Sequence, residues 1–267
     1  MPGPYIAQTG PLLMGSLLGF FLNGLFATQL YYYYSNFASS DRHAFRCLVG
    51  VVVVIEILHM FFSTHTLYYM LVEGFGNPSV LLTAPFSGAA LPALNGAVGL
   101  CTQMFFVWRI IRLNKCVVGK MAACLIMLTA CLQCSASIGV TIQFTLLARD
   151  VALLQTLKTT VTLWLAGSFA CDILISTTIA TILFIERRSV DYTPSKRLLD
   201  RLIVHTIENG LITTLCALIT LLVYLRLPDS WFYICFEVLL GRLYAVVLLA
   251  SLNGRELPTE SLSFHCA

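Results

Sequence analysis

Five charged side chains lie within long apolar stretches of the sequence, where a charge has chemical consequences. They are Glu56, Asp172, Glu208, Glu237 and Arg242. A charge at the centre of a bilayer costs about 2.5–3.5 kcal/mol on insertion scales, so such residues face the bundle interior, pair with one another or line a wet cavity. Four acids and one base would leave this interior with a net charge of −3 if all were ionised. We therefore expect that some of the acids are protonated, reach water or bind a cation.

Two histidines of the apolar stretches have a carboxylate at helical spacing. His59 follows Glu56 by three residues, and Glu208 follows His205 by three. Each pair is consistent with a simple hydrogen bond, a proton relay or a metal ligand. No H-x-x-x-H or zinc-like set accompanies them, and the sequence predicts neither a metal site nor a cofactor. Asn209 and Asn253 lie at helical spacing from members of this set and are added to it. The candidate intramembrane polar cluster is therefore Glu56, His59, Asp172, His205, Glu208, Asn209, Glu237, Arg242 and Asn253.

The single base of this set, Arg242, allows two interpretations. Asp172 and Arg242 both lie thirteen or fourteen residues from the charged residues at either end of their stretches, which places them near mid-depth. The first interpretation is a buried ion pair of Arg242 with Asp172 or Glu56 that locks the helices together. The second is a ligand, ion or catalytic site that uses the same residues, and no confident catalytic residue stands out. The two interpretations are compatible.

Seven apolar stretches must position these residues. About 20 apolar residues in a helix cross the hydrocarbon layer, and 11% charged residues cannot supply the surface of a soluble domain of this length. We therefore expect an all-α, polytopic membrane protein whose main partner is the lipid bilayer. Residues 1–267 form one seven-helix domain with a short tail at 256–267. The predicted spans are 11–34, 44–72, 90–113, 120–147, 153–185, 196–225 and 229–253.

The distribution of Lys and Arg predicts the orientation of the bundle. The first, third and fifth loops and the tail hold twelve of these residues near span ends, against three on the opposite side. Basic residues collect on the cytosolic side of a membrane. We expect the N-terminus outside or in a lumen and the C-terminus in the cytosol, in the plasma membrane or an internal membrane. The basic loops are compatible with binding of a cytosolic protein partner. The sequence does not define an oligomeric state.

The net charge of +3 comes from basic residues that are dispersed over the ends of the spans, so it does not indicate a nucleic-acid partner. Most of the ten cysteines lie within spans, where a thiol behaves as a small apolar group. Lipidation of Cys47, Cys116 or Cys266 stays open. Tyr31 to Tyr34 are expected to anchor the chain at a membrane interface. Amide side chains within the spans are expected to form hydrogen bonds between helices, namely Gln29, Asn95, Gln103, Gln133 and Gln143.

One loop and the absence of several known motifs bear on function. The apolar loop from Phe75 to Gly88 contains two prolines, and it would form either a lid over the bundle or an interfacial loop. The seventh stretch contains no lysine, which excludes a retinal Schiff base there. The third stretch ends Val107-Trp108-Arg109-Ile110, so the D-R-Y sequence of common G-protein-coupled receptors is absent, as is N-P-x-x-Y from the seventh.

The segment from Thr193 to Ile203, continuing to Glu208-Asn209-Gly210-Leu211-Ile212-Thr213-Thr214, resembles a group of uncharacterised fungal membrane proteins, chiefly from basidiomycetes. The ending Arg242-Leu243-Tyr244 with Leu248 to Arg255 is similar to that group's K-L-Y…L-L-x-x-L-N-x-R signature, with Arg242 where lysine is more common. The resemblance is strongest over residues 164–255. It implies a seven-helix integral membrane protein whose C-terminal half is a domain of unknown function, and it implies no activity.

The residues leave several functions open, and the sequence does not decide whether the chain is an enzyme. We favour an orphan receptor or sensor with a ligand pocket for an unknown small molecule inside the bundle. The first alternative is a small membrane enzyme on a lipid-soluble substrate, similar to a terpene cyclase or isomerase, with Glu56 and Glu237 as its acids. A further alternative is a proton- or cation-coupled transporter, and a scaffold also remains.

Overall fold

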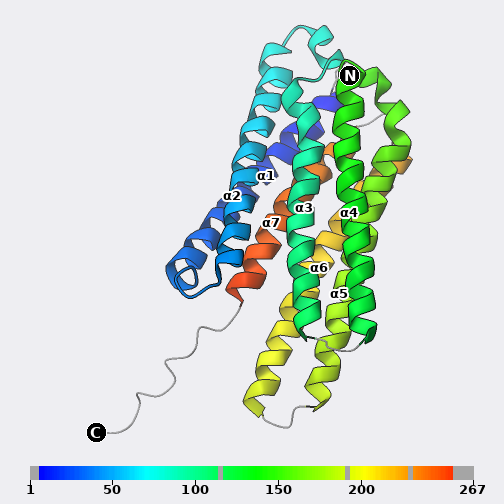
Figure 1. Ribbon diagram of the computed structural model, residues 1–267. Coiled ribbons are helices and arrows are strands. Elements are labelled where there is room, and N and C mark those ends of the chain that lie inside the picture. Colours follow the sequence, from blue (N-terminus) through cyan, green and yellow to red (C-terminus); the bar gives the residue numbers. More distant parts are fainter. Residues whose placement is uncertain (1–5, 114–116, 190–192, 228–230, 255–267) are drawn as a thin grey trace.

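The computed structural model describes residues 6–113, 117–189, 193–227 and 231–254. Within these residues the chain forms seven α-helices and three short helices, in an elongated bundle (Figure 1). The α-helices are α1 (Ile6–Asn36), α2 (His43–Tyr68), α3 (Phe86–Leu113), α4 (Val117–Leu146), α5 (Lys158–Ser189), α6 (Thr193–Arg226) and α7 (Phe232–Asn253). The short helices are the π-helix η1 (Tyr69–Glu73) and the 3-10 helices η2 (Pro78–Leu82) and η3 (Val151–Leu157).

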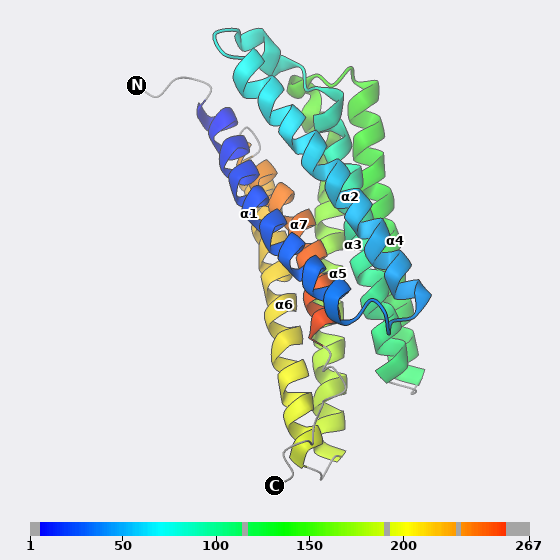
Figure 2. The same ribbon diagram turned by 90° about the vertical axis from the view of Figure 1, so that its left-hand side faces the viewer.

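Consecutive helices pack as neighbours, and α7 returns to pack along α1 (Figures 1 and 2). The central helix is α3, which contacts α2, α4, α5 and α7. Among the candidate spans, α3 and α7 bury the largest share of their apolar windows. Any polar residue on these two helices therefore has a high chance of meeting another helix rather than lipid. This arrangement places Asn95, Gln103, Glu237 and Arg242 in the interior.

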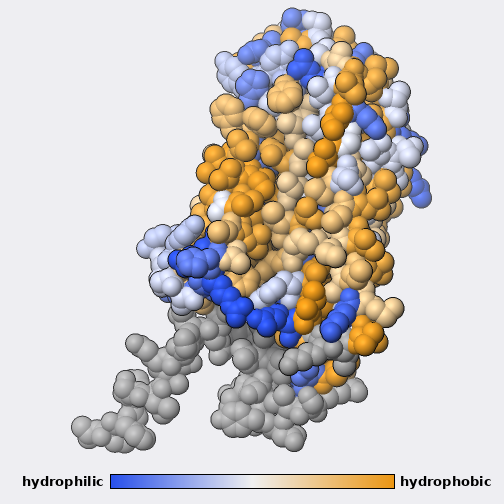
Figure 3. Space-filling model, viewed as in Figure 1, coloured by the Kyte–Doolittle hydropathy of each residue, from blue (hydrophilic) through white to orange (hydrophobic). Residues whose placement is uncertain are grey.

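Six helices are long and apolar enough to cross a membrane, and they include the parts of α1 to α5 and of α7 that the sequence predicts as spans. In α6 the described apolar part is the shorter stretch Gly210–Arg226. Large apolar side chains cover the middle of the bundle on the face shown in Figure 3, and hydrophilic residues lie toward its ends. In water such a surface would be unfavourable, so these helices indicate a multi-pass integral membrane protein.

Small residues let α1 and α7 approach closely. A Cβ atom at Gly15 would lie 2.8 Å from the Cα of Cys235, and one at Gly19 would lie 2.7 Å from Nε of Arg242. At Gly15 the neighbouring atom is backbone, so a methyl group there would push the two helices apart, and at Gly19 the Arg242 side chain would have to move. In membranes, where apolar surface gains little from leaving lipid, such close backbone packing is a main source of helix association.

The tyrosines near the end of α1 do not all lie at the surface, where an interfacial anchor is expected. Tyr31, Tyr32 and Tyr34 are exposed, as an interfacial anchor requires, whereas Tyr33 is fully buried. The hydroxyl of Tyr33 donates a 2.9 Å hydrogen bond to Oδ2 of Asp41. A buried tyrosine needs a partner for its hydroxyl group, so Asp41 fixes the turn through this bond.

Candidate functional site

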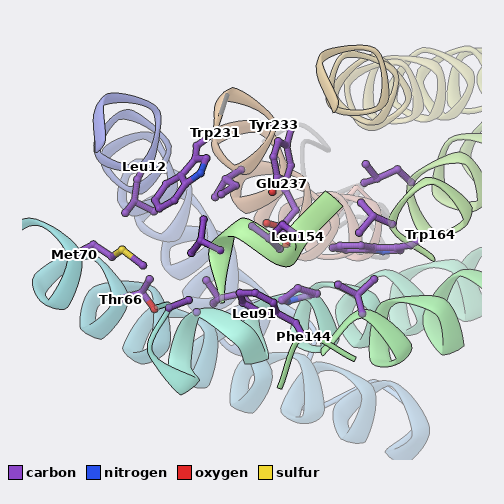
Figure 4. A pocket seen from close by; sticks show the side chains of 18 residues that line it. Leu12, Thr66, Met70, Leu91, Phe144, Leu154, Trp164, Trp231, Tyr233 and Glu237 are labelled. Carbon is purple, nitrogen blue, oxygen red and sulfur yellow. The ribbon is translucent and has the colours of Figure 1, made fainter. Parts of the chain in front are cut away.

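An apolar cavity of about 110 Å³ lies inside the bundle near the end where α1 and α7 begin (Figure 4). Residues at helical spacing supply its wall from several helices: Thr66 and Met70 lie one turn apart, and so do Val140 and Phe144. Figure 4 shows Trp164 and Trp231 at opposite sides of the cavity, with Leu154 between them. The volume approaches that of an apolar cavity known to take benzene, roughly 150 Å³. The site therefore suits a small apolar molecule or one apolar group of a larger ligand.

The cavity is covered by η3, whose residues Val151 and Leu154 belong to its lining. Asp150 begins this helix and accepts a 2.9 Å hydrogen bond from the backbone amide of Ala152, which is an N-cap. The sequence left the loop from Phe75 to Gly88 as either a lid or an interfacial loop. Within that loop, Ala84 and Gly88 line the cavity, while Phe75 is 90% exposed and lies away from it. Both this loop and the connection between α4 and α5 therefore contribute to the cover.

The two covering connections are fastened to each other. A single antiparallel bridge joins Thr83 to Asp150, and the amide of Ala84 donates a 3.0 Å hydrogen bond to the carbonyl of Arg149. Ala148 and Arg149 adopt positive φ angles of 55° and 61°. A positive φ is unfavourable for a residue with a Cβ atom. The turn that presents η3 to the cavity is therefore held in a conformation that its own residues do not prefer.

Glu237 is the charged residue among the described side chains that line this cavity. Tyr233 and Ile234 precede Glu237 by four and three residues, so both lie on the same side of the first turns of α7 as Glu237. Nδ2 of Asn95 in α3 donates a hydrogen bond to Oε1 of Glu237. This bond fixes the carboxyl group from behind and leaves its other oxygen as the polar contact that a ligand can use. The cavity thus combines aromatic walls with one acidic group.

Arg242 is only 1% exposed, and its surroundings differ from the predicted ion pair. Its Nη2 donates a 3.3 Å hydrogen bond to the hydroxyl of Ser63, and its guanidinium lies 5.9 Å from the ring centre of Phe20. Among the described residues, Nε and Nη1 of Arg242 and both oxygens of Glu56 have no hydrogen-bond partner. Glu56 is close enough to interact with Arg242 through space without direct contact. Glu56 and Arg242 are therefore neighbours in the interior without a hydrogen bond between them.

His59 lies beside this pair rather than in a metal site. Its Nδ1 is 3.5 Å from the Ser63 hydroxyl, and its Nε2 has no hydrogen-bond partner among the described residues. The described part of the chain contains no group of three or more His, Cys, Asp or Glu side chains that could hold a metal ion. The polar residues Glu56, His59 and Ser63 of α2 thus face Arg242 of α7 and form the second polar feature of the interior.

Asp172 belongs to a different group of residues and does not pair with Arg242. The hydroxyl of Tyr244 donates a 2.9 Å hydrogen bond to Oδ2 of Asp172. Tyr244 follows Arg242 by two residues, which turns it to another face of α7. Of the two acids that the sequence offers as partners of Arg242, Asp172 is therefore bonded elsewhere, to Tyr244. Sequence reasoning overlooked Tyr244, although a tyrosine within an apolar helix signals a buried hydrogen-bond partner.

The remaining members of the predicted cluster are Glu208, Asn253, His205 and Asn209. The Glu208 side chain is exposed on α6. Asn253 ends α7, where its Nδ2 donates a 2.9 Å hydrogen bond to the carbonyl oxygen of Gln29 and so ties α7 to α1. His205 and Asn209 lie on α6, and their side chains fall outside the part of the chain that the structure describes. Among the described members of the predicted cluster, Asp172 thus bonds to Tyr244, Glu237 to Asn95 and Asn253 to Gln29.

Amide side chains connect the helices as the sequence predicts. Nε2 of Gln133 donates a 2.9 Å hydrogen bond to Oε1 of Gln103, which joins α4 to α3. Oε1 of Gln143 accepts a 3.0 Å hydrogen bond from Thr160, which joins α4 to α5. Gln29 contributes its backbone carbonyl rather than its side chain. Four of the five amides therefore bond to other helices through their side-chain atoms, namely Asn95, Gln103, Gln133 and Gln143.

Comparison with known proteins gives one partial match. Residues 168–257 match the model of a family of unknown function (DUF6534). No curated protein and no solved structure matches the chain. The matched segment contains Asp172, Glu237 and Arg242, whereas Glu56 and most of the cavity wall lie before it. The match agrees with a C-terminal domain of unknown function and carries no activity with it.

Proposed function

We propose that this chain is a receptor- or sensor-like membrane protein that binds a small, largely apolar molecule in the cavity covered by η3. The observation that carries the proposal is the position of Glu237, an acidic side chain held by Asn95 in an aromatic wall. One polar group in an apolar pocket orients a ligand, while the apolar wall supplies most of the affinity. The ligand class is a small apolar molecule with a hydrogen-bond donor or a cationic group.

The proposal includes the orientation predicted from the basic residues. With the N-terminus outside or in a lumen, the cavity lies in the outer half of the bundle, where a ligand reaches it from that side. The similarity to the fungal group extends the proposal to a seven-helix family of orphan membrane proteins. The basic ends of the opposite side would then face the cytosol, where a protein partner could respond to a change in the bundle.

The enzyme alternative receives less support from the cavity. An acid pair made of Glu56 and Glu237 requires both carboxyl groups at one substrate. Glu237 lines the cavity, whereas Glu56 lies beside Arg242 and is not among the lining residues. A substrate in the cavity would therefore contact one of the two acids, which does not favour the paired mechanism.

Binding of simple aromatic probes to the full chain in lipid nanodiscs tests the proposal. Benzylamine and benzyl alcohol share the ring and differ in the polar group, and equilibrium dialysis measures their saturable binding. We expect saturable binding of benzylamine that is weaker in Glu237→Gln, because the ammonium group loses an ionic partner. Benzyl alcohol should be less sensitive to this substitution.

A matched pair of variants on η3 locates the binding. Leu154 lines the cavity, whereas its neighbour Leu153 is exposed. Leu154→Phe should fill the cavity and abolish saturable binding of both probes, and Leu153→Phe should leave it unchanged. Equal binding by the two variants, or no saturable binding of either probe to the wild-type chain, would contradict the proposed function.

A further inference from the structure

A row of polar side chains connects the acid of the apolar cavity, Glu237, with the buried base, Arg242. Nδ2 of Asn95 donates to Glu237, and the Asn95 side chain also lies within hydrogen-bonding reach of the His59 ring. Nδ1 of His59 is 3.5 Å from Oγ of Ser63, which accepts a 3.3 Å hydrogen bond from Nη2 of Arg242. This polar row therefore leaves α7 at the cavity, passes through α3 and α2, and returns to α7 deeper in the bundle.

All five members of the polar row are withdrawn from solvent. Glu237 is the most exposed of them at 7%, and His59 and Arg242 are 1% exposed. Buried polar groups are almost always hydrogen-bonded, because a group without a partner costs free energy. Since outside water does not reach these side chains, they depend on one another for their hydrogen bonds.

The two ends of the polar row fix the direction of its bonds. The guanidinium group of Arg242 has donors only, so Oγ of Ser63 accepts and the hydroxyl hydrogen is free to donate to Nδ1 of His59. At the other end, Nδ2 of Asn95 lies 3.3 Å from the backbone carbonyl oxygen of Glu237 as well as close to its carboxyl group. A backbone carbonyl can only accept. The nitrogen of the Asn95 amide therefore belongs on the Glu237 side, whatever the protonation of the acid.

His59 lies in the middle and must connect these two ends. Because its Nδ1 accepts from Ser63, the hydrogen of the neutral ring belongs on Nε2. Nε2 of His59 and Oδ1 of Asn95 have no other partner among the described residues. A hydrogen bond from Nε2 to Oδ1 satisfies both atoms and completes the row. Every bond then points from Arg242 toward Glu237, and bonds in such a series strengthen one another.

We propose that His59 is a positioning residue of the ligand site, which holds Glu237 in place through Asn95. Ser63 and Arg242 fix the ring of His59 in the tautomer that this role requires. The inference rests on the proposed function, in which Glu237 contacts the ligand. With its oxygen bonded to His59, Asn95 offers only a donor to Glu237, so the carboxyl group acts as an acceptor toward the cavity. The polar row thus favours a ligand that donates a hydrogen bond, such as an ammonium group, over one that only accepts.

A matched pair of variants tests the role of the ring. His59→Gln retains an Nε2 donor, whereas His59→Leu removes it. Equilibrium dialysis of benzylamine with the full chain in nanodiscs should give a Kd within about twofold of the wild type for His59→Gln. The Kd should be roughly two- to tenfold higher for His59→Leu, as expected for the loss of one neutral hydrogen bond. His65→Leu is the control, because His65 also lies on α2 but is exposed and interacts with Ser87 instead.

Solid-state ¹⁵N NMR of the histidine-labelled wild-type chain measures the tautomer directly. The signals of His59 are identified by their absence in His59→Gln. We expect a neutral ring with its hydrogen on Nε2 in the ligand-free chain. Ser63→Ala should shift the Nδ1 resonance, since it removes the hydroxyl donor, and saturating benzylamine should shift the Nε2 resonance, because the ligand acts on the same series of bonds. A purely structural role for the ring would not produce the second shift.

Three outcomes would overturn the inference. A hydrogen on Nδ1, or on both ring nitrogens, would mean that the bonds do not run in one direction. A wild-type Kd in His59→Leu would show that the ring does not position the acid. Equal weakening in His59→Gln and His59→Leu would assign the effect to the volume of the ring rather than to its donor. Failure of the wild-type chain to bind benzylamine would instead contradict the proposed function, and the ligand-free tautomer would still decide the direction of the polar row.

Discussion

Asn95 donates a hydrogen bond from Nδ2 to Oε1 of Glu237, and this bond joins the first half of α3 to the acidic residue of the apolar cavity. The approach of the two helices is close at this point. A Cβ atom at Gly241, one turn after Glu237, would overlap Oδ1 of Asn95. A glycine of α7 thus makes room for the amide that positions the acid. The bond therefore contributes both to stability and to the geometry of the candidate ligand site.

The first prediction concerns Asn95→Ala. Loss of the amide leaves a buried carboxyl group without its partner, which should lower the free energy of unfolding by about 1–3 kcal/mol. Benzylamine binding should weaken as well, because the carboxyl group is no longer fixed. Ser135→Ala is the control, since Ser135 is exposed and bonds only to carbonyls of its own helix. Unchanged stability and binding in Asn95→Ala would contradict the assigned role of this bond.

The second prediction compares two glycines of α1. Gly15→Ala should reduce the free energy of unfolding by about 1–3 kcal/mol, because the new methyl group meets the backbone of Cys235 and the helices must separate. A methyl group at Gly24 would have no other atom within 4 Å, so Gly24→Ala should be neutral or slightly stabilising. Reversible unfolding in mixed micelles measures both. A larger loss for Gly24→Ala would show that α1 packs differently.

The third prediction concerns the turn that presents η3. Arg149 has a φ of 61°, a conformation that costs a residue with a Cβ atom about 1–2 kcal/mol. Arg149→Gly should therefore raise the thermal midpoint. Gly76 has a φ of 75°, and Gly76→Ala should lower the midpoint for the same reason. A decrease in Arg149→Gly would show that its side chain stabilises the turn more than its backbone conformation destabilises it.

The helices themselves are predictable from the sequence because the bilayer imposes the length and apolar character of each span. The predicted span 90–113 lies within α3, and the prediction for 120–147 differs from α4 by three residues at one end and one at the other. The start of the fifth span was less accurate. Residues 151–157 continue the apolar pattern but form the separate 3-10 helix η3, which folds over the cavity. Hydropathy does not distinguish a residue that spans from one that covers a pocket.

The interior contacts were harder to predict, because they depend on how each helix is rotated toward its neighbours. Spacing indicates that Glu56 and His59 share one face of α2, and both are buried, together with Ser63. It could not assign Asp172 to Tyr244 rather than to Arg242, since that choice depends on the relative rotation of α5 and α7. The apolar cavity was also invisible in the sequence. Its wall is formed by ordinary apolar residues, and only their assembly leaves a space beside Glu237.

The last prediction separates the two acids that were considered as partners of Arg242. Arg242 acts on Glu56 through space, whereas Asp172 is bonded to Tyr244. Glu56→Gln and Arg242→Met should each destabilise the protein, and the double variant should lose less than the sum. We expect a coupling energy of roughly 0.5–3 kcal/mol in this double-mutant cycle, as for interacting neighbours. The cycle of Asp172→Asn with Arg242→Met should be additive within about 0.5 kcal/mol. Stronger coupling of Arg242 to Asp172 than to Glu56 would reinstate the pairing that the structure replaces, and additivity in both cycles would remove any electrostatic role for Glu56.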